Sequence, residues 1–158
     1  MDITQFQERL QLNENFIFSK TISTVSFDII ASFLKLKQNF GDIIFLESSE
    51  KVQSRGRYSI IAVNPDKKWI FQNEEITYRD LITKKDQLVR EEPIANLKAI
   101  IARDKITDFN GLPVMAAGWY GYLGYDMVKY YDGINIQTEG DIIPDSYFVR
   151  PEVILIFD

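Results

Sequence analysis

The sequence contains no cysteine and no histidine among its 158 residues, and these two absences exclude several kinds of active site. Without cysteine there is no disulfide framework, no thiol nucleophile and no thiolate-bound metal. Without histidine there is no Ser-His or Cys-His catalysis and no imidazole-ligated metal. Any acid–base chemistry must therefore use Asp, Glu, Lys or Tyr.

Positive charge is in deficit, with 18 Lys and Arg against 23 Asp and Glu, a formal net charge of -5. The basic residues occur mostly as singles or pairs, such as Lys67-Lys68. Nucleic-acid binding depends on Lys and Arg at phosphates, so this pattern argues against a nucleic-acid partner. Acidic pairs such as Glu74-Glu75 are interpreted as surface, because successive residues of a strand face opposite sides.

Long apolar runs are also missing. None approaches the ~20 residues that a membrane-spanning helix requires. Residues 1–5 are polar and carry no basic region, which excludes a signal peptide. We therefore expect a cytoplasmic protein without membrane association. The composition, 46% hydrophobic and 13% aromatic, is that of a folded protein, and 158 residues suit one domain over 1–158.

Local patterns predict an α+β fold with mostly antiparallel sheet and a few packed helices. Apolar spacing indicates a helix over 27–34, with Thr24 or Ser26 as N-cap, and another that begins at Pro93. The predicted strands are 43–46, 58–63 closed by a turn at 64–66, a hairpin of 68–72 and 75–79, and 147–157 interrupted at Pro151. The strongly apolar end, 153–158, suggests that the chain was cut at a domain boundary.

Glycines recur at every third position in the aromatic segment 118–125. The dinucleotide fingerprint requires a Gly-x-Gly pair and the P-loop ends in Gly-Lys-Ser/Thr, and neither pattern is present. The glycines are interpreted instead as relief of crowding among the aromatic side chains, or as points of close backbone approach.

A second group of residues follows the predicted strand 43–46. Glu47 can pair with an ammonium group, and Ser48 offers a hydroxyl and a backbone N–H. Arg55 or Arg57 can take a carboxylate in a two-point contact. These residues can therefore receive an amino acid. The alternative is an ordinary strand-to-loop junction with solvated charges.

Several segments of the chain, in order and at plausible spacing, resemble the N-terminal region of anthranilate synthase component I, a chorismate-utilising enzyme. They are Phe45-Leu46-Glu47-Ser48, Gly56-Arg57-Tyr58-Ser59, 118–126, Pro144-Asp145 and 153–158. The resemblance extends from about Phe16 to Asp158. It implies an α+β layer of antiparallel sheets that packs beside a larger, C-terminal catalytic domain.

The resemblance also implies a function for the full-length subunit, a lyase of tryptophan biosynthesis. That subunit would convert chorismate and ammonia to anthranilate and pyruvate, and a glutamine amidotransferase subunit would supply the ammonia. The chorismate pocket and the glutamates that bind Mg²⁺ belong to the catalytic domain, which is absent from 1–158. This part alone is expected to be inactive and to hold no cofactor.

In the family that the chain resembles, the Leu-Glu-Ser segment lines the feedback site for L-tryptophan. The implied contacts here are Leu46, Glu47 and Ser48, and the implied supporting residues are Arg57, Tyr58 and Ser59. The other contacts belong to the absent domain, which leaves half a site. Two alternatives remain open: the N-terminal region of aminodeoxychorismate synthase component I, of the p-aminobenzoate and folate pathway, or a stand-alone ligand-binding module.

Overall fold

The structure, a computed structural model, describes residues 7–9, 11, 15–23, 27–47, 57–106, 109, 111–134 and 142–158. Its named helices are α2 (Ile29–Lys37), α3 (Pro93–Arg103) and α4 (Val128–Asp132), with 3-10 turns η1 (Val114–Ala116) and η2 (Tyr125–Met127). Its strands are β1 (Ile43–Leu46), β2 (Ser59–Gln72), β3 (Glu75–Asp80), β4 (Lys85–Val89), β5 (Tyr120–Leu123) and β6 (Ser146–Phe157). In this part of the chain no helix is long and apolar enough to cross a bilayer.

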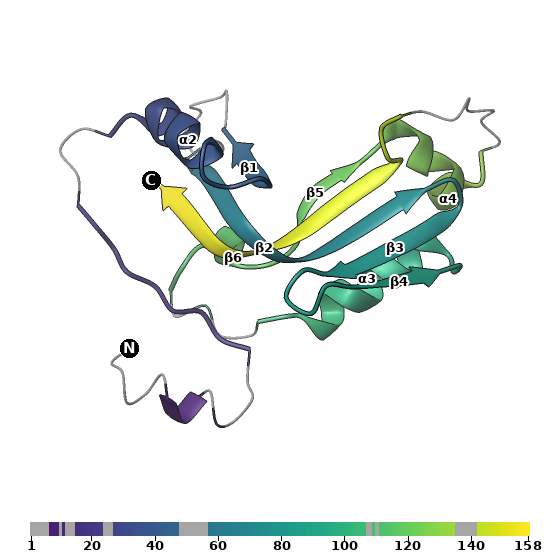
Figure 1. The fold of residues 1–158 in the computed structure, drawn as a ribbon, viewed down its shortest axis with the longest axis horizontal. Coiled ribbons are helices and arrows are strands. Elements are labelled where there is room, and N and C mark those ends of the chain that lie inside the picture. The colour runs from purple at the N-terminus through teal and green to yellow at the C-terminus, as the bar shows by residue number, and fades with distance from the viewer. Residues whose placement is uncertain are drawn as a thin grey trace.

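The strands form one antiparallel sheet in the order β4-β3-β2-β6-β5, and β1 pairs with β2 outside this path. This confirms the predicted α+β class with mostly antiparallel sheet. β2 and β6 pair from Ser59 opposite Phe157 to Phe71 opposite Ser146. β1 pairs with the beginning of β2 and β3 with its end. The sheet therefore has a first arm that contains β1 and a second arm that contains β3, β4 and β5 (Figure 1).

The two arms meet at a bend in β2. The sequence predicts that a turn at 64–66 closes this strand, and that prediction is wrong because β2 continues to Gln72. Asn64 adopts a positive φ of 55°, Pro65 lies opposite Pro151, and the register shifts between Pro65 and Lys67. A bulge bends the strand that contains it, and proline donates no cross-strand hydrogen bond. Pro151 therefore lies at the bend without interrupting β6.

Arg150 fastens the bend to the end of α3. Its Nε donates to Asp66 Oδ1 at 2.9 Å, and its Nη1 lies 2.9 Å from Asp104 Oδ2. Burial acts to raise the pKa of Asp104, but the hydrogen bond from Arg103 and the charge of Arg150 outweigh it, so that pKa is lowered. Removing Arg150 alone would leave the Asp66 carboxylate, which is 14% exposed, without this partner, so that change is expected to destabilise the bend.

The N-terminus of α2 is capped by Asp28, whose side chain accepts a hydrogen bond from Ala31 N at 2.9 Å. The prediction of Thr24 or Ser26 as the cap is therefore wrong, and both of those residues lie outside the described residues. Asp, Ser and Thr are all good N-caps, so the sequence alone does not choose among them.

The predicted start of the second helix is confirmed, since α3 begins at Pro93. Its N-cap, Glu92, accepts hydrogen bonds from the first turn. Inside the helix, Asn96 Oδ1 accepts a hydrogen bond from Trp69 Nε1 at 2.8 Å. The main core lies between α3 and the second arm, and it consists of Trp69, Phe71, Ile76, Ile94, Leu97, Ile100 and Met127.

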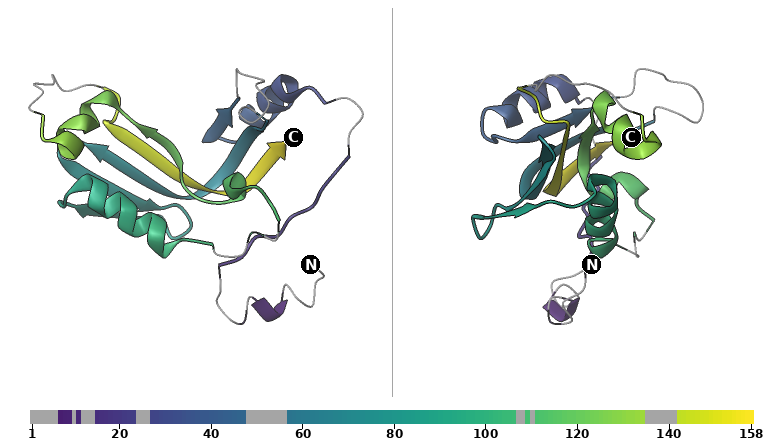
Figure 2. Two further views of the ribbon diagram at one scale, coloured as in Figure 1. Left: turned by 180° about the vertical axis from the view of Figure 1, so that it is seen from behind. Right: turned by 90° about the vertical axis from the view of Figure 1, so that its right-hand side faces the viewer.

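The helices α2 and α3 cover opposite faces of the sheet (Figure 2). Phe33 of α2 stacks on Phe45 of β1 with ring centroids 5.0 Å apart, and Phe45 is in register with Ile61 and Leu155. Alternation along β6 then places Tyr147 on the same face as Leu155. The α3 face carries Trp69 and its β6 partner Phe148. A side chain that projects from β1 past the bend can therefore meet Tyr147.

Candidate functional site

The antiparallel pairing of β1 and β2 brings together the two segments that the sequence singles out. Leu46, the last residue of β1, lies opposite Ile60, the second residue of β2. Glu47, which follows Leu46, and residues 57–59, which precede Ile60, therefore lie at the same end of the first arm. The described part of the predicted site, which is Leu46, Glu47 and residues 57–59, therefore shares one end of the arm.

Leu46 and Glu47 are both exposed at this end. The Leu46 side chain is 48% exposed, and alternation along β1 places it on the face opposite Phe45, away from α2. Glu47 forms no hydrogen bond or ion pair with any other described residue. Ser48 lies outside the described residues, as does Arg55.

Arg57 is held by the end of β6. Its guanidinium contacts the Asp158 carboxylate at both oxygens, with Nη2 2.5 Å from Oδ2, and its Cζ lies 5.1 Å from the centroid of the Tyr58 ring. The hydrogen bond from Arg57 lowers the pKa of Asp158. Tyr58 and Ser59 are half-buried. Arg57 therefore connects the segment just before β2 to the residue after β6, which stabilises this end of the sheet.

The described residues at this end carry side chains that are suited to binding an amino acid. An exposed leucine beside a carboxylate can receive an apolar side chain and an ammonium group. Among the described residues there is no group of three or more Asp and Glu that could hold a metal ion. Nothing in the described part of this end pairs a nucleophile with a base.

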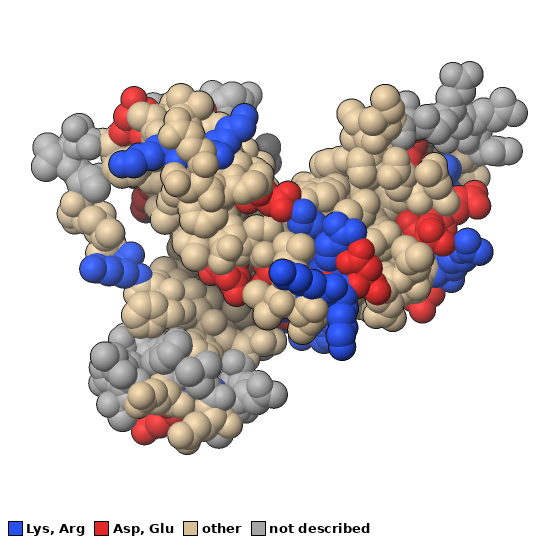
Figure 3. All heavy atoms as spheres, viewed as in Figure 1, with Lys and Arg blue, Asp and Glu red and all other residues tan. Residues whose placement is uncertain are grey.

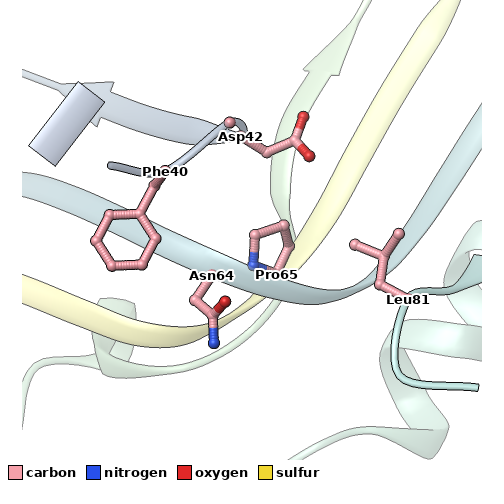
Figure 4. A pocket seen from close by; sticks show the side chains of 6 residues that line it. Phe40, Asp42, Asn64, Pro65 and Leu81 are labelled. Carbon is pink, nitrogen blue, oxygen red and sulfur yellow. The ribbon is translucent and has the colours of Figure 1, made fainter. Parts of the chain in front are cut away.

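A cavity that the sequence does not predict lies at the opposite end of β1 (Figure 4). It has a volume of about 220 Å³ and is lined by Phe40, Gly41, Asp42, Asn64, Pro65 and Leu81. Ligand pockets usually measure about 300 to 1,000 Å³, so this one is small. Its walls come from both sides of the bend, and the only trace in the sequence is the Asn64-Pro65 pair. The cavity is too far along β1 to belong to the Leu46 end.

Charges of both signs are interspersed over the face that Figure 3 shows. Lys and Arg side chains near the bend and over the second arm lie beside Asp and Glu side chains (Figure 3). In the second arm, Arg79 forms an ion pair with Asp86, 2.6 Å long. A nucleic-acid surface requires a continuous basic patch, and this face has none.

Comparisons with known proteins give consistent results. No family model matches the chain. Anthranilate synthase component 1 of Cereibacter sphaeroides is 34% identical over 135 residues, which cover 82% of this chain and 27% of that protein. The protein of the same name from Lactococcus lactis is 31% identical over 142 residues, covering 88% and 29%.

Among solved structures, anthranilate synthase component I from Streptococcus pneumoniae superposes with a TM-score of 0.52 at 23% identity. The match covers 90% of this chain and 29% of that one. This similarity supports the fold alone. The chain spans less than a third of the length of each relative described.

Proposed function

Because the chain is a homologue of anthranilate synthase component 1, we propose that it forms the N-terminal, regulatory part of such a subunit. The observation that carries the proposal is the 34% identity over 135 residues. A second protein of the same name, 31% identical over 142 residues, supports it. The full-length subunit would act in the cytoplasm, in tryptophan biosynthesis.

The proposed reaction belongs to the whole subunit. Ammonia would add to the ring of chorismate as the ring hydroxyl leaves as water, and pyruvate would then be eliminated to leave anthranilate, so carbon–oxygen bonds are broken in a lyase reaction. The Mg²⁺ that assists the reaction would be bound by glutamates of the C-terminal catalytic domain. The described residues contain no comparable cluster of carboxylates. We expect residues 1–158 alone to be inactive, because the proposed catalytic glutamates belong to the C-terminal domain.

The proposed role of this part is feedback inhibition by L-tryptophan at the end of β1. Glu47 would pair with the ammonium group, Ser48 would hydrogen-bond the ligand, and Leu46 would contact the indole ring. Arg57 would support the site through its pair with Asp158. Leu46 is 48% exposed, so its side chain is free to contact a ligand. A pocket buries most of its ligand, and the remaining walls would therefore come from another part of the full-length subunit.

Two partners are proposed besides tryptophan. They are the catalytic domain of the same subunit and a glutamine amidotransferase subunit that supplies ammonia. Exposed apolar side chains support packing against a further protein surface. On the α2 face of β6, Val153 is 46% exposed and Leu155 is 36% exposed, and Leu123 of β5 is 51% exposed.

The product of the complete subunit tests the proposed function. Incubated with chorismate, Mg²⁺ and ammonium, it is expected to release anthranilate, which is identified by its fluorescence and mass. Aminodeoxychorismate as the product would assign the subunit to the folate pathway instead. Neither product, from a subunit whose circular dichroism shows that it is folded, would favour a binding module and contradict the proposal.

A further inference from the structure

Asp42 makes a contact across the bend that the proposed function does not use. This residue directly precedes β1, in the first arm. Its Oδ2 lies 2.6 Å from Lys68 Nζ, and its Oδ1 accepts a hydrogen bond from Tyr147 OH at 3.3 Å. Lys68 and Tyr147 belong to the parts of β2 and β6 in the second arm. The three residues form a cross-arm cluster.

The cluster is partly shielded from water. The Lys68 side chain is only 15% exposed, and its Nζ lies 6.0 Å from the centroid of the Tyr147 ring, which stacks on Tyr122 of β5. Burial acts to lower the pKa of Lys68, but its hydrogen bond to Asp42 and the charges around it outweigh burial and raise that pKa. The Asp42 side chain is 41% exposed, so only the Lys68 side of the pair is well shielded. A pair with one shielded partner and a second hydrogen bond holds its geometry better than a fully exposed pair.

The pairing of Ile43 with Val63 of β2 also restrains this end of β1. β1 has four residues, and among the described strands it pairs with β2 alone, so its other edge has no strand partner in this part of the chain. The cavity beside Phe40 and Asp42 leaves space at the start of the strand, and the Asp42 side chain points away from Phe40 (Figure 4). The cross-arm cluster therefore supplies a tie at a place where close packing is incomplete.

A displacement at Asp42 would reach the far end of β1. The strand rises about 3.3 Å per residue, so Asp42 and Leu46 are separated by roughly 13 Å of extended backbone. A short paired strand moves as a unit more readily than it bends.

We propose that the cross-arm cluster of Asp42, Lys68 and Tyr147 positions β1, and through it determines how tightly tryptophan binds at the Leu46–Glu47 end. These are positioning residues, since none of them lies at that end. The inference rests on the proposed function for its ligand. Its structural part, the restraint of β1 by the second arm, is measurable without tryptophan.

The test uses Lys68→Met in the full-length subunit, a change that keeps the length of the side chain and removes the ammonium group. The concentration of tryptophan that halves activity is expected to rise about 5- to 10-fold, in the range found for residues that modulate coupling between sites. The kcat and the KM for chorismate stay unchanged. Without ligand, amide hydrogen exchange over 43–46 becomes faster. Lys68→Arg, which keeps the charge, restores most of the inhibition.

Arg79→Met is the matched control, because it removes an ion pair of the same length, 2.6 Å, from the second arm. It is expected to leave both inhibition and exchange over 43–46 unchanged. If Lys68→Met fails to fold, Tyr147→Phe removes only the hydroxyl that donates to Asp42 and predicts a smaller shift in the same direction.

Different results would contradict the proposed function and the positioning role of the cross-arm cluster. A wild-type subunit that tryptophan does not inhibit would contradict the proposed function. If tryptophan inhibits the wild type, and Lys68→Met or Tyr147→Phe changes neither inhibition nor exchange over 43–46, the positioning role is wrong. An equal effect of Arg79→Met would also overturn it, because the change would then reflect general loss of stability.

Discussion

Gly121→Ala is expected to lower the free energy of unfolding by about 3 kcal/mol, the upper part of the usual range for overpacking. A Cβ at this position would lie 1.9 Å from the backbone oxygen of Tyr147 and 2.7 Å from Phe148 Cα. Both atoms belong to the backbone of β6, so no side-chain rotation can relieve the overlap. β5 must separate from β6 or deform.

Thermal unfolding of the protein measures this effect. The expected decrease in Tm is roughly 6 to 12 °C for a domain of this size. Gly41→Ala is the control, since a Cβ at Gly41 meets nothing within 4 Å, and its effect should stay within about 0.5 kcal/mol. Equal stability of the Gly121→Ala and Gly41→Ala variants would show that β5 does not approach β6 as closely as the structure has it.

Ser48→Phe in the full-length subunit is expected to abolish feedback inhibition while activity with chorismate persists. A phenyl group in place of the hydroxyl removes a hydrogen bond and fills space that the ligand needs. The tryptophan concentration for half-inhibition should rise at least about 30-fold, the size associated with a central binding contact. Steady-state kinetics with and without tryptophan measure both quantities.

Ser19→Phe supplies a matched control at an exposed serine. It should leave activity and inhibition as they are in the wild type. A Ser48→Phe subunit that tryptophan still inhibits fully would remove Ser48 from the site. Loss of activity together with inhibition would place the residue in the structure of the subunit rather than in its regulation.

The elements that depend on local sequence were predictable. Strand 43–46 agrees with β1, and the hairpin with Asn73-Glu74 at its turn agrees with β2 and β3. Both turn residues adopt positive φ, of 51° and 62°, as a two-residue hairpin loop requires. Pro93 as the first helical residue was also readable, because its missing N–H has no partner to lose there.

The bend was not predictable, because its causes are distant in the sequence. In the sequence, Pro65 indicates a turn. In the structure, Pro65 pairs with Pro151 and Arg150 donates a hydrogen bond to Asp66, and β2 continues past these residues. For the glycine segment 118–125, the sequence predicted close backbone approach as one reason for the glycines, and the contacts of Gly121 confirm it. The partner strand, however, is visible only in the fold.

The candidate site also has a part that the sequence predicts and a part that only the fold shows. The sequence indicates that residues 46–48 and 57–59 are chemically suited to an amino acid, and strand pairing places the described part of both at one end. It carries no signal for the Asp42 contact across the bend, because that contact depends on which face of β6 presents Tyr147. Side chains that meet only through a bulge and a register shift leave no periodic pattern.

The central claim, that tryptophan binds where β1 ends and β2 begins, is tested most directly by amide hydrogen exchange of the full-length subunit with and without saturating tryptophan. The account predicts slower exchange over 43–48 and 57–61, with the region of Phe40 and Leu81 little changed. Unchanged exchange over both of these segments, or protection confined to residues around the cavity at the bend, would contradict it.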